Sequence, residues 1–162
     1  MAPVMKKLLF VFVVVGIVIF FGCNKNLPDV TVCTPLPPSA DSAALLKYAK
    51  DSSIHVTQDS SMYYQIIDSG NSNKPIFSSN VTVNYIGRLM SGYIFDSASN
   101  SNLNGARVYG LLKGWQIGLP KIGVGGRILL LIPSAYGYGC TGFLSVPANA
   151  PLYFDVRLLQ VN

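Results

Sequence analysis

The side chains that usually carry enzyme chemistry are scarce in this 162-residue chain. It has one histidine, His55, three widely spaced cysteines at Cys23, Cys33 and Cys140, and seven acidic residues that are all aspartate. A structural zinc site usually takes about four His, Cys or acidic ligands, and a catalytic triad would depend on His55 alone. The composition therefore disfavours a metal centre and a hydrolytic triad, and we expect no cofactor.

Charge and hydropathy exclude further classes of protein. Twelve basic residues against seven acidic ones give a net charge of +5, but two of the twelve are Lys6 and Lys7 in a removable N-terminal segment. The others are scattered and form no basic stripe, so we expect no nucleic-acid partner. With 50% hydrophobic and 12% charged residues, the chain fits neither long-range disorder nor a coiled coil. Its length suits one domain and a tail.

One carboxylate stands out because of its neighbour. Asp96 directly follows Phe95, and in an apolar site it could orient tyrosine hydroxyls and present a polar edge to a substrate carbonyl. An aspartate after a strand can equally cap the amides of a turn. The residues alone favour the turn.

The aromatic residues allow two interpretations. Trp115, the only tryptophan, lies between Gly114 and Gly118, which suits a short helix at the floor of a pocket. Large aromatic residues more often simply fill a core. Tyr85 and Phe154, on the inward faces of expected strands, could likewise fill a core or line a pocket. The two interpretations partly coincide, because a pocket in this position would be an incompletely filled core.

The spacing of apolar residues indicates how these side chains are positioned. Residues 81–86 alternate apolar and polar, as in a half-buried antiparallel strand, and Ser91-Gly92 suits a hairpin turn. We expect a helix over 39–49 with Asp41 as a possible N-cap, strands at 63–67, 81–86, 93–96, 127–132 and 152–161, a polar loop over 97–106, and a short helix over 114–119. The pattern predicts an α+β fold.

Four sequence blocks occur in an order that resembles one family. The blocks VTVNYIGRLMSGYIFDS, LLKGWQIGL, VGGRILLLIPSAYGYG and VPANAPLYFDVRLL are similar to those of FKBP-type peptidyl-prolyl cis-trans isomerases, over about residues 78–161. The resemblance implies a twisted antiparallel β-sheet wrapped around a short α-helix, with an apolar cavity between them that takes a peptidyl-proline. It also implies that macrolides could inhibit the protein.

The resemblance also implies a set of site residues. Catalytic roles fall to Asp96, Tyr138 and Phe95, with Trp115 as the floor of the pocket. The backbone amide of Leu112 would hold one substrate carbonyl, and Tyr138 would donate a hydrogen bond to another. The expected substrate-binding residues are Tyr85, Leu111, Leu112, Trp115, Phe143, Val146 and Phe154.

One wall of the expected pocket departs from the family pattern. The chain between Asp96 and Leu111 is shorter than usual, and residues 106–109 replace a common aromatic-x-Leu pattern. Phe143 stands in a shortened flap where it could touch substrate. We expect such changes to alter substrate preference more readily than to abolish activity.

The N-terminus reads as an export signal. Two lysines precede an apolar run from Leu8 to Phe21 that ends in Gly22-Cys23, which is short for a membrane span and suits a signal peptide. The junction resembles that of bacterial lipoproteins, in which Cys23 would be lipidated, although Phe20 stands where those signals usually have leucine. An uncleaved anchor is the alternative reading.

We therefore expect a signal peptide over 1–22, a proline-rich tether over 23–40, an extension with a helix and a strand over 41–77, and the isomerase domain over 78–162. Cys33 and Cys140 could pair in an oxidising compartment or remain two unrelated thiols. The location expected is the bacterial cell envelope, on the periplasmic side or the outer membrane, with the protein held to a membrane by its lipid.

The leading hypothesis is an enzyme that accelerates X-Pro bond rotation in newly exported, proline-containing envelope proteins. Such rotation is slow enough to limit folding. A second hypothesis is a chaperone or assembly module that grips proline-containing segments with little turnover. A third is a structural lipoprotein that has kept only the fold, which the presence of the whole aromatic set disfavours.

Overall fold

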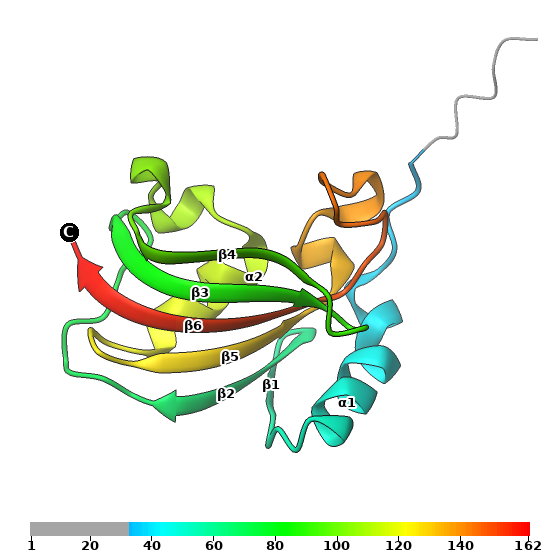
Figure 1. The fold of residues 1–162 in the computed structure, drawn as a ribbon, viewed down its shortest axis with the longest axis horizontal. Coiled ribbons are helices and arrows are strands. Elements are labelled where there is room, and N and C mark those ends of the chain that lie inside the picture. The colour runs from blue at the N-terminus through cyan, green and yellow to red at the C-terminus, as the bar shows by residue number, and fades with distance from the viewer. Residues whose placement is uncertain (1–32) are drawn as a thin grey trace, which may run out of the picture. The chain divides into compact units, whose positions relative to one another are not determined.

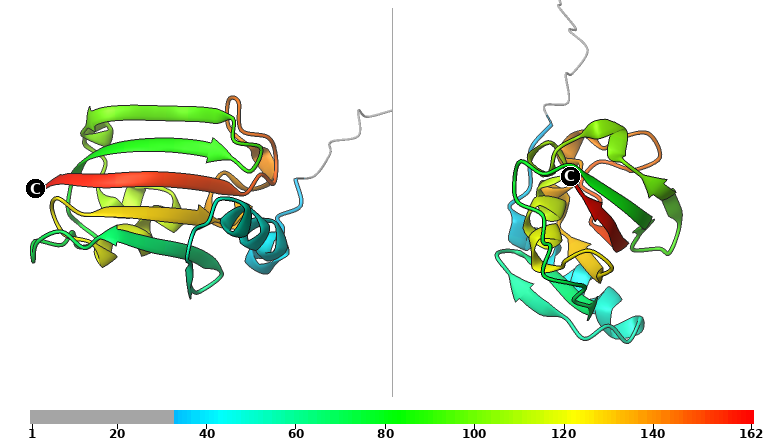
Figure 2. Two further views of the ribbon diagram at one scale, coloured as in Figure 1. Left: turned by 60° about the horizontal axis from the view of Figure 1, so that its bottom comes forward. Right: turned by 90° about the vertical axis from the view of Figure 1, so that its left-hand side faces the viewer.

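Six antiparallel strands form one twisted sheet that curves around a short helix (Figures 1 and 2). The computed structural model describes residues 33–162, so the predicted signal peptide, Cys23 and the first part of the tether lie outside the described residues. The strand order is β1-β2-β5-β6-β3-β4. The strands are β1 (Thr57–Asp59), β2 (Met62–Asp68), β3 (Val81–Leu89), β4 (Ile94–Ser101), β5 (Arg127–Ile132) and β6 (Leu152–Val161), and the helices are α1 (Ser42–Asp51) and α2 (Lys113–Gly118).

Strands β5 and β6 form the middle of the sheet and have different sequence patterns for a physical reason. In β6 the burial alternates, with Phe154, Val156 and Leu158 buried on one face, as expected for a strand with one face on the core. In β5 nearly every side chain is buried. Leu130 belongs to the core under α2, and Leu131 belongs to a second cluster under α1. Because neighbouring residues point to opposite faces, β5 is covered on both sides.

Helix α2 approaches the sheet closely because it carries two glycines on the buried side. A Cβ atom on Gly114 would stand 2.5 Å from Ile132, and one on Gly118 would stand 2.5 Å from Leu130. Both distances are well inside van der Waals contact. The glycines therefore set the depth at which the helix, and with it Trp115, rests on β5.

The polar loop expected over residues 97–106 is partly wrong. Strand β4 continues through Ser101 and pairs with β3, with Tyr85 opposite Ala98 and a register shift on either side of this stretch. The side-chain oxygen of Asn84 accepts a hydrogen bond from the backbone of Asn100 at 2.7 Å. Pairing with a neighbouring strand outweighs the weak strand preference of a Ser/Asn-rich segment.

Asp41 precedes helix α1, as predicted, but it does not cap the helix. Its carboxylate makes no capping bond to the helix and instead accepts hydrogen bonds from the backbone N–H and the hydroxyl of Ser134. The helix itself buries Leu45 and Ala49 against the outer face of the sheet. Among residues 33–162, no helix has the length and apolarity needed to cross a membrane.

Cys33 and Cys140 form a disulfide, with their Cα atoms 5.4 Å apart. The sequence left this pairing open. The bond closes a separation of 107 residues and attaches residue 33, in the expected tether, to the loop that follows β5. The described part of that tether is thus joined to the domain and ends in a 3-10 turn, Pro38–Asp41.

Candidate active site

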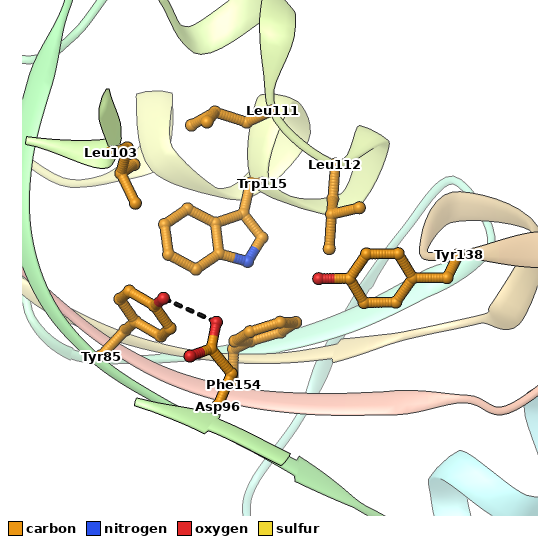
Figure 3. Close-up of a pocket in the computed structure, with 8 residues that line it drawn as sticks. All are labelled: Tyr85, Asp96, Leu103, Leu111, Leu112, Trp115, Tyr138 and Phe154. Atoms are coloured by element: carbon orange, nitrogen blue, oxygen red, sulfur yellow. Dashed lines mark hydrogen bonds between the residues drawn. The ribbon is translucent and has the colours of Figure 1, made fainter. Parts of the chain in front are cut away.

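A pocket of about 130 Å³ opens between α2 and the inner face of the sheet (Figure 3). Drug-sized ligands usually occupy roughly 300–1,000 Å³, so this pocket suits one small ring of a larger molecule that continues outside it. Its walls come from β3, β4, β6, the α2 region and the loop after β5. The lining residues are Tyr85, Asp96, Leu103, Leu111, Leu112, Trp115, Tyr138 and Phe154.

Trp115 forms the floor and is only 4% exposed. Its ring meets those of Phe154 and Tyr85 edge to face, with centroids 5.2 and 5.3 Å away, the arrangement that aromatic quadrupoles favour. The indole Nε1 is buried and has no hydrogen-bond partner among the described residues. Because the neighbouring rings contact Trp115 edge to face, they do not cover its ring. The aromatic cluster is therefore packed but leaves space above Trp115.

Tyr85 and Asp96 form the polar edge of the pocket. The Tyr85 hydroxyl donates a 2.7 Å hydrogen bond to the Asp96 carboxylate (Figure 3). Burial, and then this bond to a negative partner, raise the pKa of Tyr85 far above its usual value of 10.0. Asp96 lies within β4, at the exposed mouth of the pocket. Its recorded bond is to a tyrosine hydroxyl rather than to turn amides, so the turn interpretation of this residue is not what the structure shows.

Tyr138 faces the pocket from the loop after β5 (Figure 3). Its ring stacks on Phe143 at 5.2 Å and meets the edge of Phe95 at 6.3 Å. Burial raises the pKa of the Tyr138 hydroxyl, and the negative charge of Asp96 adds to the shift. The group is therefore a neutral hydrogen-bond donor at physiological pH.

The predicted site residues divide between two neighbouring hollows. Seven of them line the main pocket. The other three, Phe95, Phe143 and Val146, line a second hollow that shares Asp96 and Tyr138 with the first. The sequence analysis had placed nine of the ten around one cavity and Phe143 in the flap beside it. Their functional roles remain predictions, and Cys23 lies outside the described residues.

Leu103 is a lining residue that the sequence analysis missed. It lies in the shortened segment after β4, in a 3-10 turn, and it is the only large apolar residue among residues 97–106. That single leucine was the available signal. In the altered stretch that follows, Val108 is fully buried, whereas Tyr109 is exposed and packs on Phe77 outside the pocket.

The Gln116 side chain holds this irregular wall in place. Its amide donates hydrogen bonds to the carbonyls of Tyr109 at 2.9 Å and Leu111 at 2.8 Å. The wall before α2 is thus fixed by the helix itself. Within residues 33–162, no group of three or more His, Cys, Asp or Glu side chains is arranged to hold a metal ion.

Comparison with known proteins decides the family. The family model of FKBP-type peptidyl-prolyl cis-trans isomerases matches residues 71–159. The chain belongs to this family. FkpA of Escherichia coli strain K12, an FKBP-type peptidyl-prolyl cis-trans isomerase, is 39% identical over 120 residues, which are 72% of this chain and 43% of FkpA. FK506-binding protein 1 of Saccharomyces cerevisiae is 42% identical over 89 residues, 51% of this chain and 75% of the yeast protein.

Solved structures confirm the predicted fold. The crystal structure of Escherichia coli FkpA superposes with a TM-score of 0.64 at 36% identity, covering 76% of this chain and 61% of the other. A peptidyl-prolyl cis-trans isomerase from Pseudomonas syringae gives a TM-score of 0.62 at 26% identity, covering 80% and 98%. This chain spans less than half the length of FkpA.

Proposed function

We propose that the protein is a peptidyl-prolyl cis-trans isomerase that turns the X-Pro bond in the pocket above Trp115. The observation that carries the proposal is a ring-sized aromatic pocket whose mouth holds a hydrogen-bonded Tyr85–Asp96 pair and the donor Tyr138. Membership of the isomerase family supports the same reaction.

The reaction asks for a pocket of this kind. Rotation about an X-Pro bond breaks amide resonance, with a barrier of about 18–20 kcal/mol, and no covalent bond to the enzyme is needed. A planar amide is strongly polar and well hydrated, whereas a twisted amide has less charge separation. An apolar pocket therefore disfavours the planar form more than the twisted one. A thousandfold acceleration requires only about 4 kcal/mol of such selectivity.

Hydrogen-bond donors at the pocket edge add to this selectivity. No backbone acceptor among the described residues is paired with the amide of Leu112, at the entrance to α2, so it can bind a substrate carbonyl. The Tyr138 hydroxyl can bind a second one. Asp96 keeps the Tyr85 hydroxyl turned aside, which leaves the interior apolar for the proline ring.

The test is an NMR exchange measurement on a Leu-Pro or Phe-Pro peptide with purified protein. At micromolar protein, catalysis should broaden the cis and trans signals of the peptide or transfer magnetisation between them. FK506 should suppress this effect by competing for the pocket. Exchange equal to that of the peptide alone would exclude the enzyme.

A proline-binding chaperone is the second candidate, and two exposed apolar residues favour it. Phe143 is 56% and Leu144 is 91% exposed, and both border the hollow beside the pocket. These side chains could hold apolar client segments without turning a bond. Replacing Leu144 with serine keeps the stacking of Phe143 on Tyr138, and should reduce suppression of client aggregation while sparing peptide isomerisation.

We further propose that the protein acts on exported clients from a membrane anchor. The support is the apolar segment before Gly22-Cys23 and the Cys33–Cys140 disulfide, since structural disulfides persist mainly in oxidising compartments. Labelling with a radioactive fatty acid should mark the wild-type protein and not Cys23→Ala. Equal labelling of both would exclude lipidation at this residue.

A further inference from the structure

The N-terminal arm, defined here as residues 33–41, is bonded to the loop that carries Tyr138. One attachment is the Cys33–Cys140 disulfide, and Cys140 lies two residues after Tyr138. Figure 1 shows the arm, in blue, running beside the orange segment that follows β5. A segment remote in sequence is thus a direct neighbour of the site.

The second attachment lies on the other side of Tyr138. The Asp41 carboxylate accepts hydrogen bonds from the backbone N–H and the hydroxyl of Ser134, each 2.7 Å long. Ser134 is fully buried and Asp41 is only 8% exposed. Bonds to a charged acceptor are strong, and their loss would leave two donors of Ser134 without a partner. The arm therefore holds the loop four residues before Tyr138 and two residues after it.

The loop between these attachments consists of two short 3-10 turns, and its Gly139 carbonyl accepts a 2.8 Å hydrogen bond from the backbone N–H of Asn149. Tyr138 is flanked by Gly137 and Gly139, and glycine gives the backbone wide conformational freedom; Gly139 has a φ of 60°. Phe143 stacks on the Tyr138 ring but belongs to the same loop, so it moves with it. Phe95 supplies an edge contact from β4. To these contacts the arm adds one covalent bond, at Cys140, and one charged acceptor, at Ser134.

We infer that the arm is a positioning element that sets the Tyr138 hydroxyl for catalysis. No residue of the arm lines either hollow, so the arm acts through Tyr138 rather than on substrate. The inference rests on the proposed isomerase function. Displacing a catalytic group by about 1 Å can cost as much as a hundredfold in rate, so an effect at this distance is measurable.

A double-mutant cycle tests the inference. Two arm variants, Cys33→Ser/Cys140→Ser and Asp41→Ala, are each made with Tyr138 intact and with Tyr138→Phe. With Tyr138 intact, each variant should lower kcat/KM by about tenfold, mainly through kcat. In the Tyr138→Phe background the same changes should lower it less than about twofold, because the hydroxyl they position is gone. Asp41→Asn, which keeps one acceptor oxygen, should recover part of the loss.

A matched control separates positioning from general destabilisation. Val81→Ala removes buried volume in β3, outside the pocket lining, and should lower the unfolding midpoint without changing kcat/KM well below that midpoint. Equal losses from the arm variants in both backgrounds would overturn the inference, as would no loss with Tyr138 intact.

The two proposals fail in different ways. If the wild-type protein does not accelerate exchange, the isomerase function is wrong, and FK506 affinity becomes the measurement for the arm. Weaker binding in the arm variants only when Tyr138 is intact would still support positioning. Unchanged binding would overturn it.

Discussion

The two faces of the sheet carry apolar clusters that differ in how completely they are filled. Under α1, the cluster of Leu45, Ala49, Tyr63 and Leu131 is buried and lines none of the described pockets. Under α2, Trp115 and Phe154 are also buried, yet a ring-sized space remains above them. Both faces obey the same rule of apolar residues inside. The difference shows that this site is a core left open by perpendicular aromatic rings.

The largest expected effect comes from removing the pocket floor. Trp115→Ala should lower the free energy of unfolding by about 3–5 kcal/mol, as for other buried aromatic truncations. It should also reduce kcat/KM by about a hundredfold, because the surface that positions the proline ring is removed. Urea unfolding and the exchange assay measure the two quantities. Unchanged kcat/KM in folded Trp115→Ala would show that the open face is not the site.

The matching change on the filled face should affect stability alone. Leu131→Ala removes a fully buried side chain from the cluster under α1, and should cost about 2–5 kcal/mol of unfolding free energy. At temperatures where the variant stays folded, kcat/KM should equal that of the wild type. A large loss of activity in the folded variant would mean that the two faces are coupled.

Changes at the polar edge should lower activity without unfolding the protein. Asp96→Ala frees the Tyr85 hydroxyl, and Tyr138→Phe removes a donor. Each should reduce kcat/KM by about tenfold, which corresponds to one hydrogen bond of about 1.4 kcal/mol in the transition state. Because Asp96 lies at the exposed mouth, the unfolding midpoint of Asp96→Ala should be close to that of the wild type. Circular dichroism melting provides the check.

The smallest expected effect is a pH dependence of stability on the α1 side. Burial, with the negative charge of Asp155 second, raises the pKa of Tyr153 to about 12 from 10.0. The folded state therefore keeps this proton after the unfolded state has lost it. The stabilisation is complete below pH 10 and is lost as the pH rises from about 10 to 12. Urea titrations across this range should show a shallower decline for Tyr153→Phe than for the wild type.

Sequence patterning predicted most of the strands because each has a clear physical signature. The alternation in β6 and the apolar run of β5 follow directly from burial on one face and on both. The end of β4 was not predictable in this way, since its Ser and Asn residues form a strand only through pairing with β3.

The site was predictable in part for the same kind of reason. The sequence motifs and their order identified the aromatic residues as candidates for the site. Local sequence, however, contains no information on which of them line the same hollow. The division between the main pocket and the hollow at Phe143 depends on loop geometry. Leu103 was missed because its segment reads as polar. The disulfide and the Asp41–Ser134 bonds join segments about a hundred residues apart, and no local pattern marks them.

The position of β6 has a consequence for how the protein is made. β6 pairs with β5 on one side and β3 on the other, and no other strand within residues 33–162 joins the two halves of the sheet. Tyr85 and Asp96 belong to one half, whereas Trp115 and Tyr138 are packed on or follow the other. A nascent chain that has emerged only as far as Ala150 lacks the strand that joins these two halves of the sheet. We therefore expect the pocket to be completed only when residues 152–161 have emerged and paired with both halves, which also brings Phe154 into its lining.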